Sequence, residues 1–283
     1  LPGDEAIMAE QDYCSMLDMF ELMKERHGMI PKKVSVPNNP LSDDEIVELY
    51  RSKITPKTKL IMVCHMINIT GHILPIRKIC DMAHRQGVEV LVDGAHSFAH
   101  IPVSMKDLDC DYFGTSLHKW LNAPLGNGML YVKRDKIKSL WPLFAESPKA
   151  PGNMARLNHT GTTPVHTILG IEDAINYQKV LGAKRKTTRL RFLQNYWVDK
   201  VKQFPNVKIN TPSDPLRSCA IANVGVDGIT PKDLAKRLLD EFKIWTVGID
   251  RPGVVGCRIT PNIYTTTTEL DSFVDAIYQI SKS

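Results

Sequence analysis

Two kinds of hydrophobic pattern alternate along the first half of the chain. Residues 60–64 and 88–92 form short, nearly continuous apolar runs, which are typical of strands buried on both faces. Residues 4–27 predict a short strand followed by a helix, because their later apolar positions recur at helical spacing. This alternation of strand and helix predicts an α/β fold with a mostly parallel sheet sandwiched by helices.

Capping and breaker residues mark several predicted helix boundaries. Ser42 and Glu45 form a capping-box pattern, which predicts a helix that runs through Tyr50. Pro75 suits the first turn of the next helix, and Gly87 suits the position just past its end. Each apolar run is therefore preceded by a helix with its own start or stop signal.

The pattern changes after residue 132. Residues 138–158 are rich in Pro, Trp and Lys with weak periodicity, and they predict a long connecting loop. Two long helical patterns follow, at about 164–181 and 184–203. Short strands come next, together with a helix opened by Thr230 and a final helix opened by a second capping box at Thr266. This order is typical of a smaller α+β unit.

We therefore predict three parts. The large domain covers residues 1–165, bridging helices cover 166–203, and a small C-terminal domain covers 204–283. A chain of 283 residues is long enough to bury a substantial core in this arrangement.

Composition and charge narrow the function classes. The net charge of +5 comes from 36 basic and 31 acidic residues scattered along the chain, without a dense basic run, so nucleic-acid binding has little support. No run approaches the ~20 apolar residues that span a bilayer, so we expect no membrane insertion. The six cysteines lie far apart without a C-x-x-C pair, which predicts reduced thiols and neither a disulfide framework nor a metal site.

Polar side chains follow three successive apolar strands. Asn68, Asp93 and Ser116 each come shortly after a strand, and ligands of such sheets bind outside the carboxyl ends of the strands. Any one of them could be a turn or cap residue. Three in succession, ending at His118 and Lys119, favour a common site.

The segment around this lysine resembles a known family. Its sequence, Leu117-His118-Lys119-Trp120-Leu121 followed by x-Ala-Pro-x-Gly-x-Gly, is similar to the active-site segment of class V aminotransferases, which are pyridoxal-phosphate enzymes of fold type I. It is most similar to the isopenicillin N epimerase-like branch. The resemblance spans residues 1–264 and implies the large and small domains of that fold.

The resemblance assigns the central catalytic roles. Lys119 forms the internal aldimine with pyridoxal 5'-phosphate, and its freed amine then moves the substrate α-proton. Asp93 pairs with the pyridinium nitrogen, which lets the ring accept electrons from the substrate carbanion. His96 stands near the phenolic oxygen of the cofactor. A capping or metal-binding Asp93 and a structural His96 are the alternatives.

The resemblance also implies the binding residues. Ser116 and His118 match phosphate-binding positions, Asn68 matches a residue that contacts the cofactor or the substrate carboxylate, and Tyr13 matches a ring-stacking position. A core tyrosine is the alternative for Tyr13. Near the end of the chain, Arg258 matches the arginine that takes the substrate α-carboxylate through a bidentate fork, with a structural salt bridge as the alternative.

The assembly follows from the same resemblance. Gly161 and Thr162 resemble a loop that reaches the phosphate of a neighbouring subunit, so we expect a homodimer with shared active sites. Relatives carry a phosphate-binding turn before the position of Leu1. The chain itself begins without Met, so we expect further sequence upstream. We expect a cytoplasmic enzyme.

The reaction itself stays open at this level. Epimerisation, transamination and β-elimination on an amino acid share one carbanion. A C–S lyase or cysteine desulfurase-like activity is the alternative, although residues 245–256 lack the nucleophilic cysteine that a desulfurase needs. A cofactor-free scaffold is a second alternative. A dinucleotide-dependent oxidoreductase is disfavoured, because no G-x-G-x-x-G follows an early strand.

Overall fold

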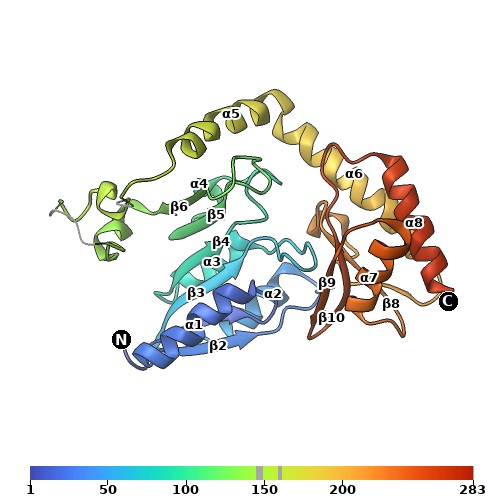
Figure 1. Ribbon diagram of the computed structural model, residues 1–283. Coiled ribbons are helices and arrows are strands. Elements are labelled where there is room, and N and C mark those ends of the chain that lie inside the picture. The colour runs from blue at the N-terminus through green and yellow to red at the C-terminus, as the bar shows by residue number, and fades with distance from the viewer. Residues whose placement is uncertain (145–148, 159–160, 283) are drawn as a thin grey trace.

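The structure is a computed structural model that describes residues 1–144, 149–158 and 161–282, and it contains two separate sheets (Figure 1). The large sheet has the strand order β2-β1-β3-β4-β5-β6, and all its strands are parallel except β6, which pairs antiparallel with β5. Its strands are β1 (Glu5–Ala9), β2 (Ile30–Val34), β3 (Thr58–Cys64), β4 (Glu89–Asp93), β5 (Tyr112–Ser116) and β6 (Gly128–Val132). The mostly parallel sheet predicted from the apolar runs is confirmed.

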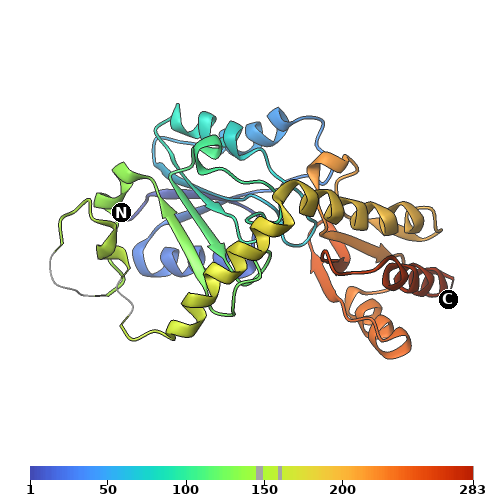
Figure 2. The ribbon, with the colours of Figure 1, turned by 90° about the horizontal axis from the view of Figure 1, so that it is seen from above.

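Helices lie on both faces of the large sheet (Figure 2). Its helices are α1 (Cys14–His27), α2 (Asp43–Arg51), α3 (Ile76–His84) and the short α4 (Met105–Leu108). Helices α2 and α3 cover one face, and α1 lies on the other. The apolar side chains of α1 are only partly buried, because Phe20 is buried whereas Met23 is 38% exposed.

Side-chain capping explains where α2 begins. The Ser42 hydroxyl accepts a hydrogen bond from Glu45 N–H (3.2 Å), as the capping-box pattern predicted. The Glu45 carboxylate accepts from Leu41 N–H (2.6 Å), one residue earlier than a reciprocal box requires. At α3, Pro75 is the residue just before the helix, and Gly87 lies three residues beyond its end with φ +70°.

The second half of the chain forms two long helices and a small antiparallel sheet of order β7-β8-β10-β9. The elements are α5 (Val165–Leu181), α6 (Ala183–Val201), β7 (Val207–Ile209), β8 (Ala222–Val226), α7 (Pro231–Phe242), β9 (Val247–Arg251), β10 (Val254–Ile259) and α8 (Thr267–Ser281). Thr230 caps α7, and the reciprocal capping box predicted at α8 is present.

The connection between β6 and α5 is more ordered than the predicted loop. Its described residues include two 3-10 helices, Arg134–Ser139 and Met154–Leu157. The Arg156 guanidinium donates to the carbonyls of Ile137 (3.0 Å) and Leu140 (2.7 Å), at the end of the first of these helices. This tertiary contact links residues too far apart for a local periodicity to reveal.

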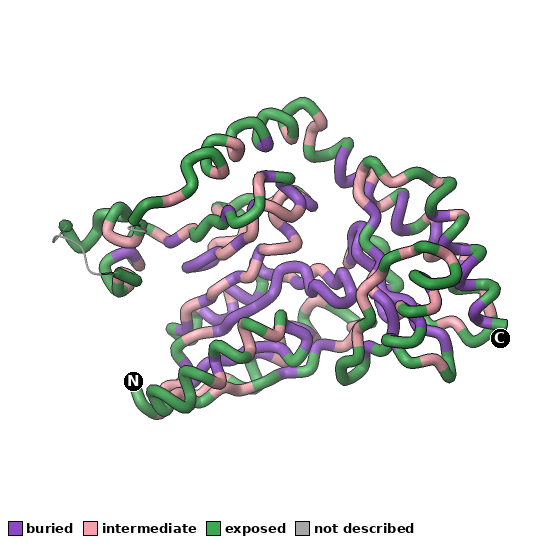
Figure 3. The backbone as a smooth tube through the Cα atoms, viewed as in Figure 1, coloured by how far each residue is buried: buried purple, intermediate pink, exposed green. Residues whose placement is uncertain are grey.

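Each sheet has its own hydrophobic core, which Figure 3 shows as buried strands flanked by half-exposed helices. Val63, Val90 and Phe113 belong to the core of the large sheet. In the small-sheet core, Trp197 of α6 packs edge-on against Phe273 of α8, with 5.2 Å between ring centroids. Among the residues that the structure describes, no helix is both long enough and apolar enough to cross a lipid bilayer.

The segment between β3 and α3 joins the two halves. Thr211 Oγ1 donates to the carbonyl of Thr70 (2.8 Å), and Ile73 N–H donates to the carbonyl of Arg217 (2.8 Å). Gly71 sits between these bonds with φ +75°, and a Cβ placed there would lie 2.0 Å from the carbonyl oxygen of Ile221. Only glycine allows the two backbones to approach this closely.

We predict that Gly71→Ala destabilises the protein by more than about 2 kcal/mol, because it adds a backbone clash to the strain of a positive φ. Gly87→Ala is the matched control, since Gly87 has φ +70° but open space around its Cβ position. Its expected cost is about 1 kcal/mol. Urea unfolding of both variants tests this, and equal losses would contradict the close approach at Gly71.

Acid should destabilise the same segment through buried histidines. His72 is 1% exposed, and burial and the charge of Arg217, opposed by Asp43, lower its pKa from 6.5 to about 4. The unfolded chain therefore binds more protons than the folded protein between these values, so stability is lost as the pH falls from 6.5 towards 4.

We predict that His72→Leu flattens this acid loss by up to about 1.4 kcal/mol per pH unit. Urea unfolding of the variant and the wild type at about pH 7.5, 6.0 and 5.0 measures how the free energy of unfolding of each depends on pH. These values lie on both sides of the pKa of free histidine, ~6.5. Parallel slopes would show that His72 does not titrate with folding.

Candidate active site

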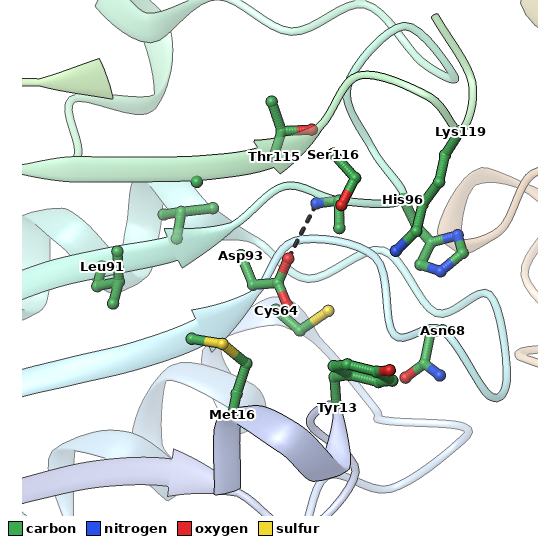
Figure 4. A pocket seen from close by; sticks show the side chains of 13 residues that line it. Tyr13, Met16, Cys64, Asn68, Leu91, Asp93, His96, Thr115, Ser116 and Lys119 are labelled. Atoms are coloured by element: carbon green, nitrogen blue, oxygen red, sulfur yellow. Dashed lines mark hydrogen bonds between the residues drawn. The ribbon is translucent and has the colours of Figure 1, made fainter. Parts of the chain in front are cut away.

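A cavity of about 300 Å³ lies at the carboxyl end of the parallel strands (Figure 4). The turns and strand ends that follow β1, β3, β4 and β5 supply its walls, as the sheet rule predicts. Its lining includes six of the predicted site residues: Tyr13, Asn68, Asp93, His96, Ser116 and Lys119. Residues 106 positions apart in the chain therefore meet in one place (119 − 13).

Asp93 ends β4 and turns into the cavity. Its Oδ1 accepts a hydrogen bond from Ala95 N–H (2.9 Å), and the turn is tight because a Cβ at Gly94 would lie 1.9 Å from the Phe113 ring. Burial raises the pKa of the Asp93 carboxyl, whereas the Ala95 N–H and the charge of Lys119 act in the opposite direction. A cationic group beside Asp93 would therefore favour its ionised form.

Lys119 reaches the same cavity from the loop between β5 and β6. Its Nζ lies 5.9 Å from the centre of the Tyr13 ring. Burial lowers the pKa of Lys119, although the charge of Asp93 partly opposes the shift. A larger fraction of this amine is therefore neutral than in a solvated lysine, and the neutral amine is the form that attacks a carbonyl carbon.

His96 is held by an aromatic neighbour. The Trp120 Nε1–H donates to His96 Nδ1 (3.2 Å), and the Trp120 ring stacks on His100 with 3.7 Å between centroids. Burial, together with the charges of Lys119 and Arg258, lowers the pKa of His96 well below its usual range. The imidazole is therefore neutral, and because Nδ1 accepts from Trp120, its proton belongs on Nε2.

Arg258 of β10 approaches from the small sheet. Its Nη1 donates to the backbone carbonyl of Asn68 (3.3 Å), while its Nε and the Asn68 Oδ1 are buried without a hydrogen-bond partner among the described residues. Arg258 lines a second cavity, of about 280 Å³, beside Trp245 and Phe273. No ion pair holds this guanidinium within the described part of the chain, which speaks against the structural salt bridge considered as its alternative.

Two predicted residues stand apart from the first cavity. His118 is half-buried beside Lys119 but does not line the cavity, and its Nδ1 has no hydrogen-bond partner among the described residues. Thr162 is exposed on the segment before α5 and does not line the cavity either. The structure thus brings six of the nine predicted residues to one cavity and Arg258 to its edge through Asn68.

Sequence reasoning missed several lining residues, among them Met16, Cys64 and Thr115. The sequence pattern marks Cys64 only as an apolar residue, but Cys64 is the last residue of β3 and therefore lies at the end of the strand, where the cavity is. Thr115 directly precedes Ser116, and its hydroxyl donates to the carbonyl of Gly94 (3.2 Å). Both residues lie at strand ends, and that signal would have found them.

Comparison with known proteins gives relatives over nearly the whole chain. An isopenicillin N epimerase from Amycolatopsis lactamdurans is 29% identical over 297 residues, covering 99% of this chain and 75% of the epimerase. A cysteine desulfurase from Haloferax volcanii is 27% identical over 298 residues, covering 98% of this chain and 68% of the desulfurase.

Solved structures confirm the fold. The complex of the cystine C–S lyase C-DES with its reaction product cysteine persulfide matches with a TM-score of 0.87 at 21% identity, covering 98% of this chain and 75% of that chain. The predicted fold type I architecture is therefore correct. A family model described as aminotransferase class-V matches residues 1–248. The chain belongs to the class-V aminotransferase family, whose members are pyridoxal-phosphate-dependent enzymes.

Proposed function

We propose that the first cavity binds pyridoxal 5'-phosphate through Lys119 and that the protein acts on the α-carbon of an amino acid or an amino-acid-containing substrate. The observation that carries this proposal is the placement of Asp93 and Lys119 in one cavity. Burial shifts the pKa of each side chain in the direction that favours its neutral form, and the charge of the other side chain opposes this shift.

The residues fit the cofactor chemically. A protonated ring nitrogen beside Asp93 would offset the burial of its carboxylate, and a carbonyl carbon beside Lys119 would meet an amine of lowered pKa. The aromatic ring of Tyr13 faces the same space and suits stacking on a flat heterocycle. The neutral His96 presents an Nε2–H donor for a phenolic oxygen.

The phosphate contacts are part of the proposal. Ser116 lines the cavity and carries a hydroxyl, and His118 follows two residues later with an Nδ1 that has no hydrogen-bond partner in the described part of the chain. Thr162 joins this set only if a second copy of the chain presents it, because in its own chain it lies away from the cavity.

Bound pyridoxal phosphate supplies an electron sink for the bonds at the substrate α-carbon. Asp93 then holds a proton on the ring nitrogen through its carboxylate. The Lys119 amine takes and returns the α-proton, a role that the lowering of its pKa by burial favours. His96 orients the cofactor ring through its Nε2–H, and Trp120 fixes that tautomer by donating to Nδ1.

Arg258 would bind the substrate α-carboxylate together with Asn68. The guanidinium is partly buried, lacks a carboxylate partner within the described residues and already contacts the Asn68 backbone. A carboxylate is the planar partner that a guanidinium fork matches best.

Among the reactions open to the family, we propose an epimerase-like one, with a C–S lyase as the alternative. The greater identity to an isopenicillin N epimerase than to a desulfurase supports this order. Cys257 is fully buried in β10, where its Sγ donates to the carbonyl of Pro231 (3.5 Å), so it is poorly placed as a desulfurase nucleophile. A cofactor-free scaffold is the alternative if the wild-type protein does not bind pyridoxal phosphate.

We also propose a homodimer with shared active sites. Helix α5 buries only Ala174 among its described residues, while Val165, Ile168, Leu169 and Val180 are 48 to 77% exposed. Such an apolar helix face, running on from Thr162, suits burial against a second copy of the chain.

A cytoplasmic location is consistent with the cysteines. None of the six forms a disulfide, and five of them are buried thiols. Unpaired, buried cysteines are typical of proteins from reducing compartments.

We predict that pyridoxal phosphate binds through Lys119. Purified protein given pyridoxal phosphate should show the visible absorbance band of a lysine-bound cofactor, and Lys119→Ala should abolish it. Lys106→Ala, at an exposed position of α4, is the matched control and should keep the band. Absence of the band from the wild type would leave the scaffold alternative.

We predict that Arg258 binds the carboxylate of the substrate. Spectral titration with L-alanine and L-alaninamide should show that the wild type binds the carboxylate-bearing ligand more tightly. Arg258→Gln should weaken L-alanine binding by about 10- to 100-fold and leave the amide nearly unaffected, because it removes only a charged hydrogen-bond donor set. Arg251→Gln, on exposed neighbouring β9, is the control. An equal loss for both ligands would argue against the carboxylate role.

A further inference from the structure

We propose that Lys186 and Thr187, in the first turns of α6, are positioning residues. They fix the position of the turn that carries Lys119 relative to the turn that carries His96. This inference rests on the proposed function of the cavity. It concerns a site that the sequence motifs do not touch, because both residues lie more than 60 positions beyond Lys119.

Lys186 forms a hydrogen bond with the loop that carries Lys119. It is 4% exposed, and its Nζ donates to the backbone carbonyl of Trp120 (2.5 Å), the residue next to Lys119. The same Nζ donates to Gln178 Oε1 (2.9 Å). A buried ammonium group is thus aimed at the peptide that follows Lys119.

Gln178 of α5 forms further hydrogen bonds with the same loop. Its Nε2 donates to the carbonyl of Leu121 (3.1 Å) and, more weakly, to that of Trp120 (3.4 Å). Two successive carbonyls of the loop are therefore held by side chains of the bridging helices. The loop also closes on itself, because Asn122 N–H donates to the carbonyl of Lys119 (3.2 Å) and Ala123 N–H donates to that of Leu117 (3.1 Å).

Thr187 forms a hydrogen bond with the turn that carries His96 and His100. Its hydroxyl donates to the carbonyl of His100 (3.3 Å), and His100 Nδ1 contacts the carbonyl of His96 (2.9 Å). The stack of His100 on Trp120 then links the two turns directly. Adjacent residues of one helix therefore hold both the lysine loop and the histidine turn, and the Trp120–His96 hydrogen bond depends on the register between them.

A purely structural role would not need a buried cation. Burial lowers the pKa of Lys186 to about 8, because the charged form is less favourable there than in water. No carboxylate forms an ion pair with Lys186 among the described residues. An apolar side chain would fill the same volume without that desolvation cost, so the ammonium is explained by the carbonyl that it holds.

The test compares Lys186→Met, which keeps the length and loses the donor, with Lys186→Gln, which keeps a neutral donor. Leu193→Ala is the control, because Leu193 is fully buried on the same helix but packs in the small-sheet core. Hydrogen exchange is measured in cofactor-free protein for the amides of residues 117–123 and, as an internal reference, for those of β4.

In Lys186→Met, the amides of Asn122 and Ala123 should exchange roughly tenfold faster relative to β4, the factor for loss of one hydrogen bond from a charged donor. Lys186→Gln should restore part of the protection. Leu193→Ala should raise exchange in both segments alike. Unchanged relative protection in Lys186→Met would overturn the proposal.

The cofactor-loaded protein gives a second readout. Lys186→Met should shift the pH midpoint of the visible band and lower kcat/KM by about 10- to 100-fold, since a small displacement of a catalytic group has effects of this size. A wild-type protein without the band would overturn the proposed function, while the exchange comparison would still decide the positioning role. A normal band midpoint and normal kcat/KM in Lys186→Met would overturn the positioning role alone.

Discussion

Asp93 lies opposite Cys64 of β3 on one side and Gly114 of β5 on the other, in the parallel ladder of the large sheet. This register is the constraint on which the rest of the site depends. Because parallel strands all end at the same edge, the turns after them open into one space. Asn68 follows β3, Asp93 ends β4 and Lys119 follows β5, so three turns separated by dozens of residues share one cavity.

The same cavity sets the electrostatics. Asp93 and Lys119 are taken out of water together, and each acquires a pKa shifted towards the neutral form. Their opposite charges limit both shifts. A polar cofactor with a cationic ring nitrogen and an electrophilic carbon would engage both groups at once, which is the chemistry of the family to which the chain belongs.

The second half of the chain acts on this site through two contacts of different kinds. Arg258 reaches across to the Asn68 backbone, and the closely packed turn at Gly71 brings the small sheet near enough for that reach. The bridging helices hold the lysine loop from behind through Lys186 and Gln178. The cavity is therefore built from the large sheet, but its geometry is fixed by residues that follow it in sequence.

The sequence by itself predicted the alternation of strands and helices along the chain and the helix starts at Ser42, Thr230 and Thr266, and it singled out Asp93 and Lys119 as candidate site residues. Local periodicity and capping are encoded in neighbouring residues, and the Ser-x-His-Lys segment is contiguous, so both can be read without a fold. The roles of the individual site residues remain predictions.

Only the tertiary structure decided which side chains face the cavity and what holds them. It added Met16, Cys64 and Thr115 to the lining and placed His118 and Thr162 away from it. It also placed two 3-10 helices, linked by Arg156, in the connection between β6 and α5. It also placed the buried Lys186 against the Trp120 carbonyl. These features depend on contacts between residues distant in sequence, and a local pattern carries no information about which distant carbonyl or ring a side chain will meet.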